Sequence, residues 1–133
     1  MHITIRTIPH EQQRYETCGD WQEFGEDTII NVSEMGDSLA EILVGIHELV
    51  EVVLCRHRGI SQEIVDKFDK HFEATRLKDD TSEPGDYPLA PYRKEHFFAT
   101  NIERMIAHEL GVDWAKYEEI VNTLDQSVAS KHK

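Results

Sequence analysis

The first quarter of the chain alternates apolar and polar residues, which is the pattern of half-buried strands. Residues 2–8 read HITIRTI, with isoleucines on one side and polar residues on the other. Two further short runs, DWQEF at 20–24 and TIINV at 28–32, flank the turn sequence GED at 25–27. We therefore expect a small antiparallel sheet of two to three strands, in which the last two strands form a hairpin.

Residues 38–58, SLAEILVGIHELVEVVLCRHR, form a long predicted helix that is apolar on nearly every side. One broad face carries Leu39, Ile42, Leu43, Ile46, Leu49, Val50, Val53 and Leu54. Val44, Val52 and Cys55 fall on the opposite side, and a helix of this kind is usually buried. Acidic residues and a histidine interrupt it, although buried charge is costly unless it is paired or bound to a metal. The sequence HELVE at 47–51 is therefore the feature that a function has to explain.

Three more helices are expected, at residues 61–76, 92–110 and 114–126. Because the turn between the first two helices is short, these helices are expected to pack antiparallel. The segment 78–91, KDDTSEPGDYPLAP, is a Pro-rich loop that would form a lid or a partner-binding edge. The segment 129–133 is expected to be a disordered tail. The whole chain thus reads as a single α+β domain, a small sheet packed against about four helices.

The chain has 133 residues and a formal net charge of −12, which argues against general affinity for the nucleic-acid backbone. This charge fits cation binding, a basic protein partner or simple solubility. No apolar run is long enough for a membrane span, and the N-terminus has no secretory signal pattern. Cys18 and Cys55 match no metal spacing and are expected to be free thiols. A cytoplasmic location is expected.

A candidate metal site combines residues of two predicted helices. His47 and Glu51 are four residues apart and share one side of the first helix. His96 and Glu103 are seven apart on a later helix, only roughly 20° from each other. The apolar side expected for that helix carries Phe98, Ile102, Met105 and Ile106. A His and a Glu from each helix can close around one divalent cation, zinc in the first place, with iron or manganese as alternatives.

The order of strands, motif helix and later helix resembles the zincin metalloproteases, whose active helix carries H-E-x-x-H. The motif here is His47-Glu48-Leu49-Val50-Glu51, so Glu51 stands where that family has its second histidine. The resemblance implies that His47 is a ligand, that Glu48 is the general base and that a later helix supplies a third ligand.

The departure at Glu51 weighs against proteolysis in particular, but a carboxylate can still be a ligand. His96 or Glu103 would supply the third ligand, and Glu103 would otherwise fix the orientation of a histidine. The sequence predicts a metal-binding domain and, beyond that, a metal-dependent hydrolase of a small molecule or a peptide.

Two alternatives remain open. The carboxylates Glu48, Glu51, Glu63 and Asp66 resemble the E-x-x-E…E-x-x-D signature of magnesium-dependent nucleotide pyrophosphohydrolases, the MazG-like group. On the second helix, however, Glu63 and Asp66 fall on the side away from the apolar stripe. The other alternative is an acidic interaction module of the phage or mobile-element type, without catalysis. A buried polar network without a metal would explain the same residues.

Overall fold

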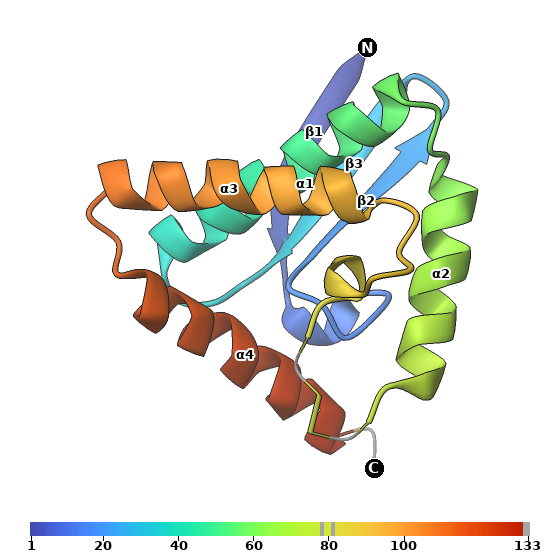
Figure 1. Cartoon of the computed structure of the whole chain (residues 1–133). Helices are drawn as coiled ribbons and strands as arrows, with labels where there is room; N and C mark the ends of the chain where they lie inside the picture. Colours follow the sequence, from blue (N-terminus) through green and yellow to red (C-terminus); the bar gives the residue numbers. More distant parts are fainter. Residues whose placement is uncertain (78, 81, 132–133) are drawn as a thin grey trace.

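The computed structural model describes the backbone of residues 1–77, 79–80 and 82–131, and the side chains of the described residues up to 124. Its elements are, in chain order, β1 (His2–Ile8), η1 (His10–Gln12), β2 (Gly19–Phe24), β3 (Asp27–Ser33), α1 (Ser38–His57), α2 (Gln62–Thr75), η2 (Pro84–Asp86), α3 (Arg93–Glu109) and α4 (Trp114–Lys131). This arrangement confirms the predicted α+β class (Figure 1). None of the helices in the described part of the chain is long and apolar enough to cross a membrane.

The sheet has three strands in the order β1-β3-β2. The strands β2 and β3 form the predicted antiparallel hairpin, and Gly25 takes a positive φ of 62° in its turn. The strand β1, however, pairs in parallel with β3, so the sheet is mixed and not wholly antiparallel. The reason is topological. The connection after β1 reverses the chain into β2, and β3 returns between them, so β3 runs in the same direction as β1.

The helix α1 packs on the sheet (Figure 1). Its residues Val44 and Val52 are buried in one core together with Ile30 and Val32 of β3. Gly45 makes this close packing possible, because a Cβ atom there would lie 3.2 Å from the Cγ2 atom of Ile5. A glycine in the interior of a helix is unfavourable by itself, so its presence fits a need for close approach.

The buried side of α1 is not the side that the sequence indicated. Ile42 and Val53, from the expected apolar face, are each 49% exposed. The buried residues are Ala40, Leu43, Val44, Gly45, His47, Glu51, Val52 and Cys55. His47 and Glu51 therefore lie within the buried face, and the apolar face that was expected inside is partly outside.

The helix α3 also differs from the expectation: Ile102 and Ile106 are half-buried, and Ile106 packs on the core. Phe98 and Met105, which were expected inside, are 50% and 65% exposed. The buried residues are Glu95, His96, Ala99, Glu103 and Ala107. The same physical reason explains the buried sides of α1 and α3. Small and polar side chains pack between the two helices because the polar ones find hydrogen-bond partners there, as described below.

The remaining helices enclose this centre. Figure 1 shows α2 leaving the end of α1 along one side of the molecule, rather than packing antiparallel against α1 as expected, while α4 closes the opposite side. The Pro-rich segment lies between them and contains η2. The helix α4 extends to Lys131 and so includes residues 129–131 of the expected disordered tail, while 132 and 133 lie outside the described residues.

Substitutions at Gly45 test the packing of α1 on the sheet. We expect Gly45→Ala to change the free energy of unfolding little, because a gain of about 1 kcal/mol in helix propensity offsets the tight contact with Ile5. Gly45→Leu should destabilise the protein by about 1–3 kcal/mol or more, since the larger side chain must displace β1 or β3. Urea denaturation measures both, and equal effects of the two variants would contradict this account.

Candidate metal centre

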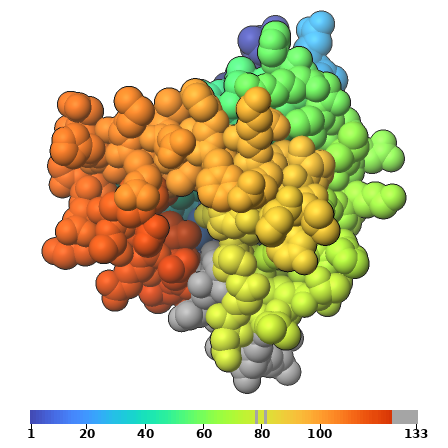
Figure 2. Space-filling view, in the orientation of Figure 1, coloured from blue at the N-terminus to red at the C-terminus, as the bar shows by residue number. Residues whose placement is uncertain are grey.

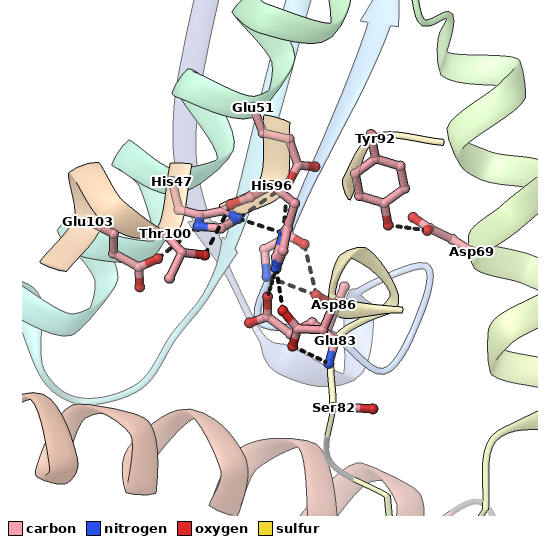
Figure 3. A network of polar contacts seen from close by, with 12 residues as sticks. His47, Glu51, Asp69, Ser82, Glu83, Asp86, Tyr92, His96, Thr100 and Glu103 are labelled. Carbon is pink, nitrogen blue, oxygen red and sulfur yellow. Dashed lines mark hydrogen bonds and ion pairs between the residues drawn. The ribbon is translucent and has the colours of Figure 1, made fainter. Parts of the chain in front are cut away.

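The candidate site lies where α1, α3 and η2 meet, beside the start of β2 and the start of α4 (Figure 3). The structure brings together the four residues that the sequence nominated as ligands. His47 and Glu51 come from α1, and His96 and Glu103 come from α3. All four are buried, with between 3% and 7% of each residue exposed.

Three polar atoms at the centre form a nearly equilateral triangle. The Nε2 atom of His47 lies 3.2 Å from the Oε2 atom of Glu51 and 3.2 Å from the Nδ1 atom of His96. The third side, from His96 Nδ1 to Glu51 Oε2, measures 3.1 Å. One nitrogen of each imidazole and one carboxylate oxygen therefore point at a common centre.

The other nitrogen of His47 is held from outside the triangle. Its Nδ1 atom lies 2.8 Å from the Oε1 atom of Glu103. The second oxygen of Glu103 accepts a hydrogen bond from the hydroxyl of Tyr117 on α4. Because an ionised carboxylate only accepts hydrogen bonds, Nδ1 of His47 carries the proton, and a neutral ring would turn the lone pair of Nε2 inward.

His96 is held in the same manner by the Pro-rich segment. Its Nε2 atom lies 3.0 Å from the Oε2 atom of Glu83 and 3.0 Å from the Oδ1 atom of Asp86. Gly85 between them packs directly on the imidazole, since a Cβ atom at this position would lie 2.4 Å from the Cγ atom of His96. The segment is thus docked on His96 by two carboxylates and by a close backbone contact.

Glu51 is fixed by the sheet. The indole Nε1–H of Trp21 on β2 donates a hydrogen bond of 3.0 Å to the Oε1 atom of Glu51. This contact leaves Oε2, the other oxygen, facing the two histidines. Each of the three central groups therefore has its outer atom held by a different element of the fold.

The electrostatics follow from these contacts. Burial alone would lower the pKa of His47, but hydrogen bonds to Glu103 and Glu51 outweigh it and hold the pKa well above its usual value. The pKa of His96 is raised against burial in the same way by the carboxylates around it. Burial would raise the pKa of Glu51, but the hydrogen bonds from both histidines lower it. The surrounding carboxylates thus favour positive charge on or between the two imidazoles.

Glu48, the candidate base, lines a cavity of about 570 Å³ that also exposes His47, Glu51 and His96. Figure 2 shows the opening as a hollow between α3, α4 and the η2 segment. Burial, followed by the neighbouring charge of Glu51, raises the pKa of Glu48 well above its usual value. Gly19 leaves room for this side chain, because a Cβ atom there would lie 2.8 Å from its Oε1 atom.

The carboxylates of the pyrophosphohydrolase alternative do not converge. Glu48 and Glu51 line the cavity, whereas Glu63 is exposed on α2 and is not among the residues that line it. Asp66 accepts two hydrogen bonds of 3.2 Å from Arg14. The acidic outer side of α2, on which the interaction alternative depends, is therefore partly neutralised.

Sequence reasoning missed Glu83 and Asp86. One ligand atom each from His47, Glu83 and His96 lie within 4.8 Å of one another, so Glu83 is a further potential ligand. The signal was weak: an acidic pair around Pro84 and Gly85 in a loop already considered as a lid. Periodicity says nothing about where such a loop docks.

No known protein family, curated protein or solved structure matches this chain.

A substitution at Gly85 tests the docking of the Pro-rich segment on His96. Gly85→Ala adds a methyl group where the imidazole already lies, so the segment must move away from His96. We expect a loss of about 1–3 kcal/mol in the free energy of unfolding. Pro88→Ala, an exposed change in the same segment, is the matched control and should have a small effect. If both variants melt like the wild type, the segment is not docked in this way.

Proposed function

We propose that the protein binds a divalent metal ion through His47, His96 and Glu51 and uses it in metal-dependent hydrolysis. The observation that carries this proposal is the triangle of inward-facing atoms, combined with carboxylates on both outward nitrogens. In metal sites, a ligating histidine almost always donates its other N–H to a carboxylate, a carbonyl or a water. Both histidines here have that partner.

The spacing supports the proposal. Ligand atoms bound to one zinc ion at roughly 2.0–2.1 Å lie about 2.9 Å apart at right angles and about 3.3 Å apart at the tetrahedral angle. The observed separations of 3.1–3.2 Å fall between these values. Two imidazole nitrogens and one carboxylate oxygen form a ligand set used by zinc hydrolases, and they also suit iron and manganese.

The competing explanation is a buried ion network in which both imidazoles are protonated. It satisfies the carboxylates, but it sets two N–H groups against each other at the 3.2 Å contact between His47 and His96. Two donors that face each other at this distance repel. A cation held by two lone pairs removes the repulsion, and so does one neutral imidazole, in which the Nε2 atom of His47 accepts a hydrogen bond from the Nδ1–H of His96. Metal binding is proposed because both outward nitrogens have the carboxylate partners that ligating histidines have, and metal analysis separates the two explanations.

The remaining groups have separate roles in this proposal. Glu103, Asp86 and Trp21 hold the ligands in orientation from outside. Glu83 also contacts the outward nitrogen of His96, and it can compete with Glu51 for the third ligand position because its ligand atom lies within 4.8 Å of one from each histidine. The site keeps an open side towards the cavity, where a substrate can approach.

Glu48 is the proposed general base. A metal ion at the centre would lower the pKa of bound water to about 7. Glu48 lines the same cavity, and no hydrogen bond or ion pair of its carboxylate to another described residue competes with a role in proton transfer. The pairing of His47 with an adjacent Glu keeps the likeness to the zincin motif, while Glu51 in place of a histidine makes a substrate other than a protein the better expectation.

Metal analysis tests the binding proposal directly. Protein purified without a histidine tag should contain about one zinc, iron or manganese ion per chain by elemental analysis. Chelation should lower thermal stability, because a metal present at 100 times its dissociation constant stabilises the folded state by about 2.7 kcal/mol. The absence of metal, together with an unchanged melting temperature in chelator, would refute the proposal.

Variants locate the metal. We expect His47→Ala, His96→Ala and Glu51→Gln to abolish stoichiometric zinc binding in titration calorimetry, and Glu103→Gln to weaken it by about 10–100-fold. His108→Ala is the matched control, because His108 is an exposed histidine of α3 that also precedes a glutamate. Glu83→Gln decides whether Glu83 is a ligand. If it weakens zinc binding as much as Glu51→Gln does, Glu83 and not Glu51 is assigned as the third ligand.

Glu48→Gln separates catalysis from binding. With p-nitrophenyl acetate as a probe ester, the zinc-loaded wild type should hydrolyse it faster than the metal-free protein. Glu48→Gln should keep its zinc and lose about 10²–10⁴-fold in rate, the usual contribution of a general base. Glu63→Gln, which changes an exposed acid of α2, should leave the rate unchanged. Equal rates for Glu48→Gln and the wild type would remove Glu48 from the mechanism.

A further inference from the structure

Acidic side chains predominate among the charged residues that line the cavity beside the two histidines. Its volume of about 570 Å³ suits a small molecule. Carboxylates from α1, α2, the Pro-rich segment and α4 line it in addition to those that contact the histidines. Among the residues that the structure describes, no lysine or arginine lines it. Away from the two histidines, phosphates and other polyanions would therefore meet repulsion in this space.

Some of these acids are neutralised from outside the cavity and some are not. Asp20 lies 2.7 Å from Arg14, and Glu73 lies 3.1 Å from Arg76. In contrast, the described part of the chain contains no salt bridge to Glu48, Asp69 or Glu118. Burial raises the pKa of Asp69 to about 7, while the hydrogen bond that it accepts from the Tyr92 hydroxyl favours its charged form. Glu118 accepts a hydrogen bond from the indole N–H of Trp114, so both carboxylates lie next to an aromatic ring.

Aromatic rings form much of the rest of the lining, namely Tyr15, Trp21, Tyr92, Trp114 and Tyr117. The hydroxyl oxygen of Tyr15 is buried and has no hydrogen-bond partner in the described part of the chain. A buried polar atom without a partner costs about 1–3 kcal/mol, so a ligand that donates a hydrogen bond there is favoured. Aromatic faces together with carboxylates are surroundings that stabilise alkylammonium groups. Two of these rings already have a cationic neighbour, since the Arg14 guanidinium lies 4.9 Å from the centre of the Tyr15 ring and that of Arg104 lies 5.0 Å from the centre of the Trp114 ring.

We propose that this cavity binds the ammonium group of a small aliphatic amine, and that the substrate class of the site is an ester or amide that carries such a group, whose acyl bond water would cleave. The inference rests on the proposed function for its chemistry, because it places the substrate next to His47 and His96. The ammonium group would lie between Asp69, Glu118 and the Tyr15 hydroxyl, while the alkyl chain would lie along the aromatic rings.

Titration calorimetry with matched probes tests this specificity. Putrescine, a four-carbon diamine, should bind to the zinc-loaded protein. Butane-1,4-diol, which has the same length without charge, and inorganic pyrophosphate should not bind. The inference is overturned if the diol binds as well as putrescine, or if pyrophosphate binds and putrescine does not.

Variants separate a built site from general attraction to an acidic protein. Asp69→Asn keeps an oxygen for the Tyr92 hydroxyl, so it should fold, and it should weaken putrescine binding about tenfold, which is the loss of one charged contact. Glu118→Gln should act similarly. Glu63→Gln removes the same charge from the exposed side of α2 and should change the affinity less than twofold. Equal losses in Asp69→Asn and Glu63→Gln would overturn the inference.

The two proposals fail in distinguishable ways. Putrescine binding is also measured with chelator-treated protein, because no metal can contribute to the affinity there. If the protein takes up no zinc but still binds putrescine with the predicted loss in Asp69→Asn, the metal proposal fails and the amine site stands. If zinc binds stoichiometrically and putrescine does not bind in either state, the amine site fails alone.

Discussion

The burial of mutually hydrogen-bonded polar groups at the junction of α1 and α3 is the constraint on which the rest of this structure depends. Glu51 is shared by two imidazoles, and each imidazole is held again by a carboxylate on its far side. None of these groups can be buried alone, because an unpaired buried charge is strongly destabilising. The strand β2, the η2 segment and the helix α4 each contribute a partner, so the network ties distant parts of the chain to one centre.

Close packing around this centre requires small residues at particular positions. Gly19 leaves space for Glu48, and Gly85 lies against the ring of His96. On α3, Ala99 and Ala107 are buried together with His96 and Glu103. Because these positions carry almost no side chain, the polar groups approach one another without displacing the backbone. The glycines and alanines are therefore part of the site, although they carry no chemistry.

The sequence predicted the elements better than it predicted their orientation. Alternation located all three strands, and 3.6-residue periodicity located the four helices. It also nominated His47, Glu51, His96 and Glu103, which the fold brings together. The buried sides of α1 and α3 were wrong because hydrophobicity alone ranks a phenylalanine above a glutamate, whereas a glutamate with two partners can be buried more fully. Glu83 and Asp86 could not be placed, because no periodic signal fixes where a loop docks.

The buried face of the two central helices also has a consequence for recognising distant relatives. On α1 the positions that the proposed site uses follow the pattern G-x-H-E-x2-E from Gly45 to Glu51. On α3 they follow H-x2-A-x3-E-x3-A from His96 to Ala107. The outward-facing residues of both helices are free to diverge, because nothing in the site depends on them. Distant relatives should therefore be recognised by these two sets of small and polar residues, which lie about 45 residues apart, more than by overall sequence similarity.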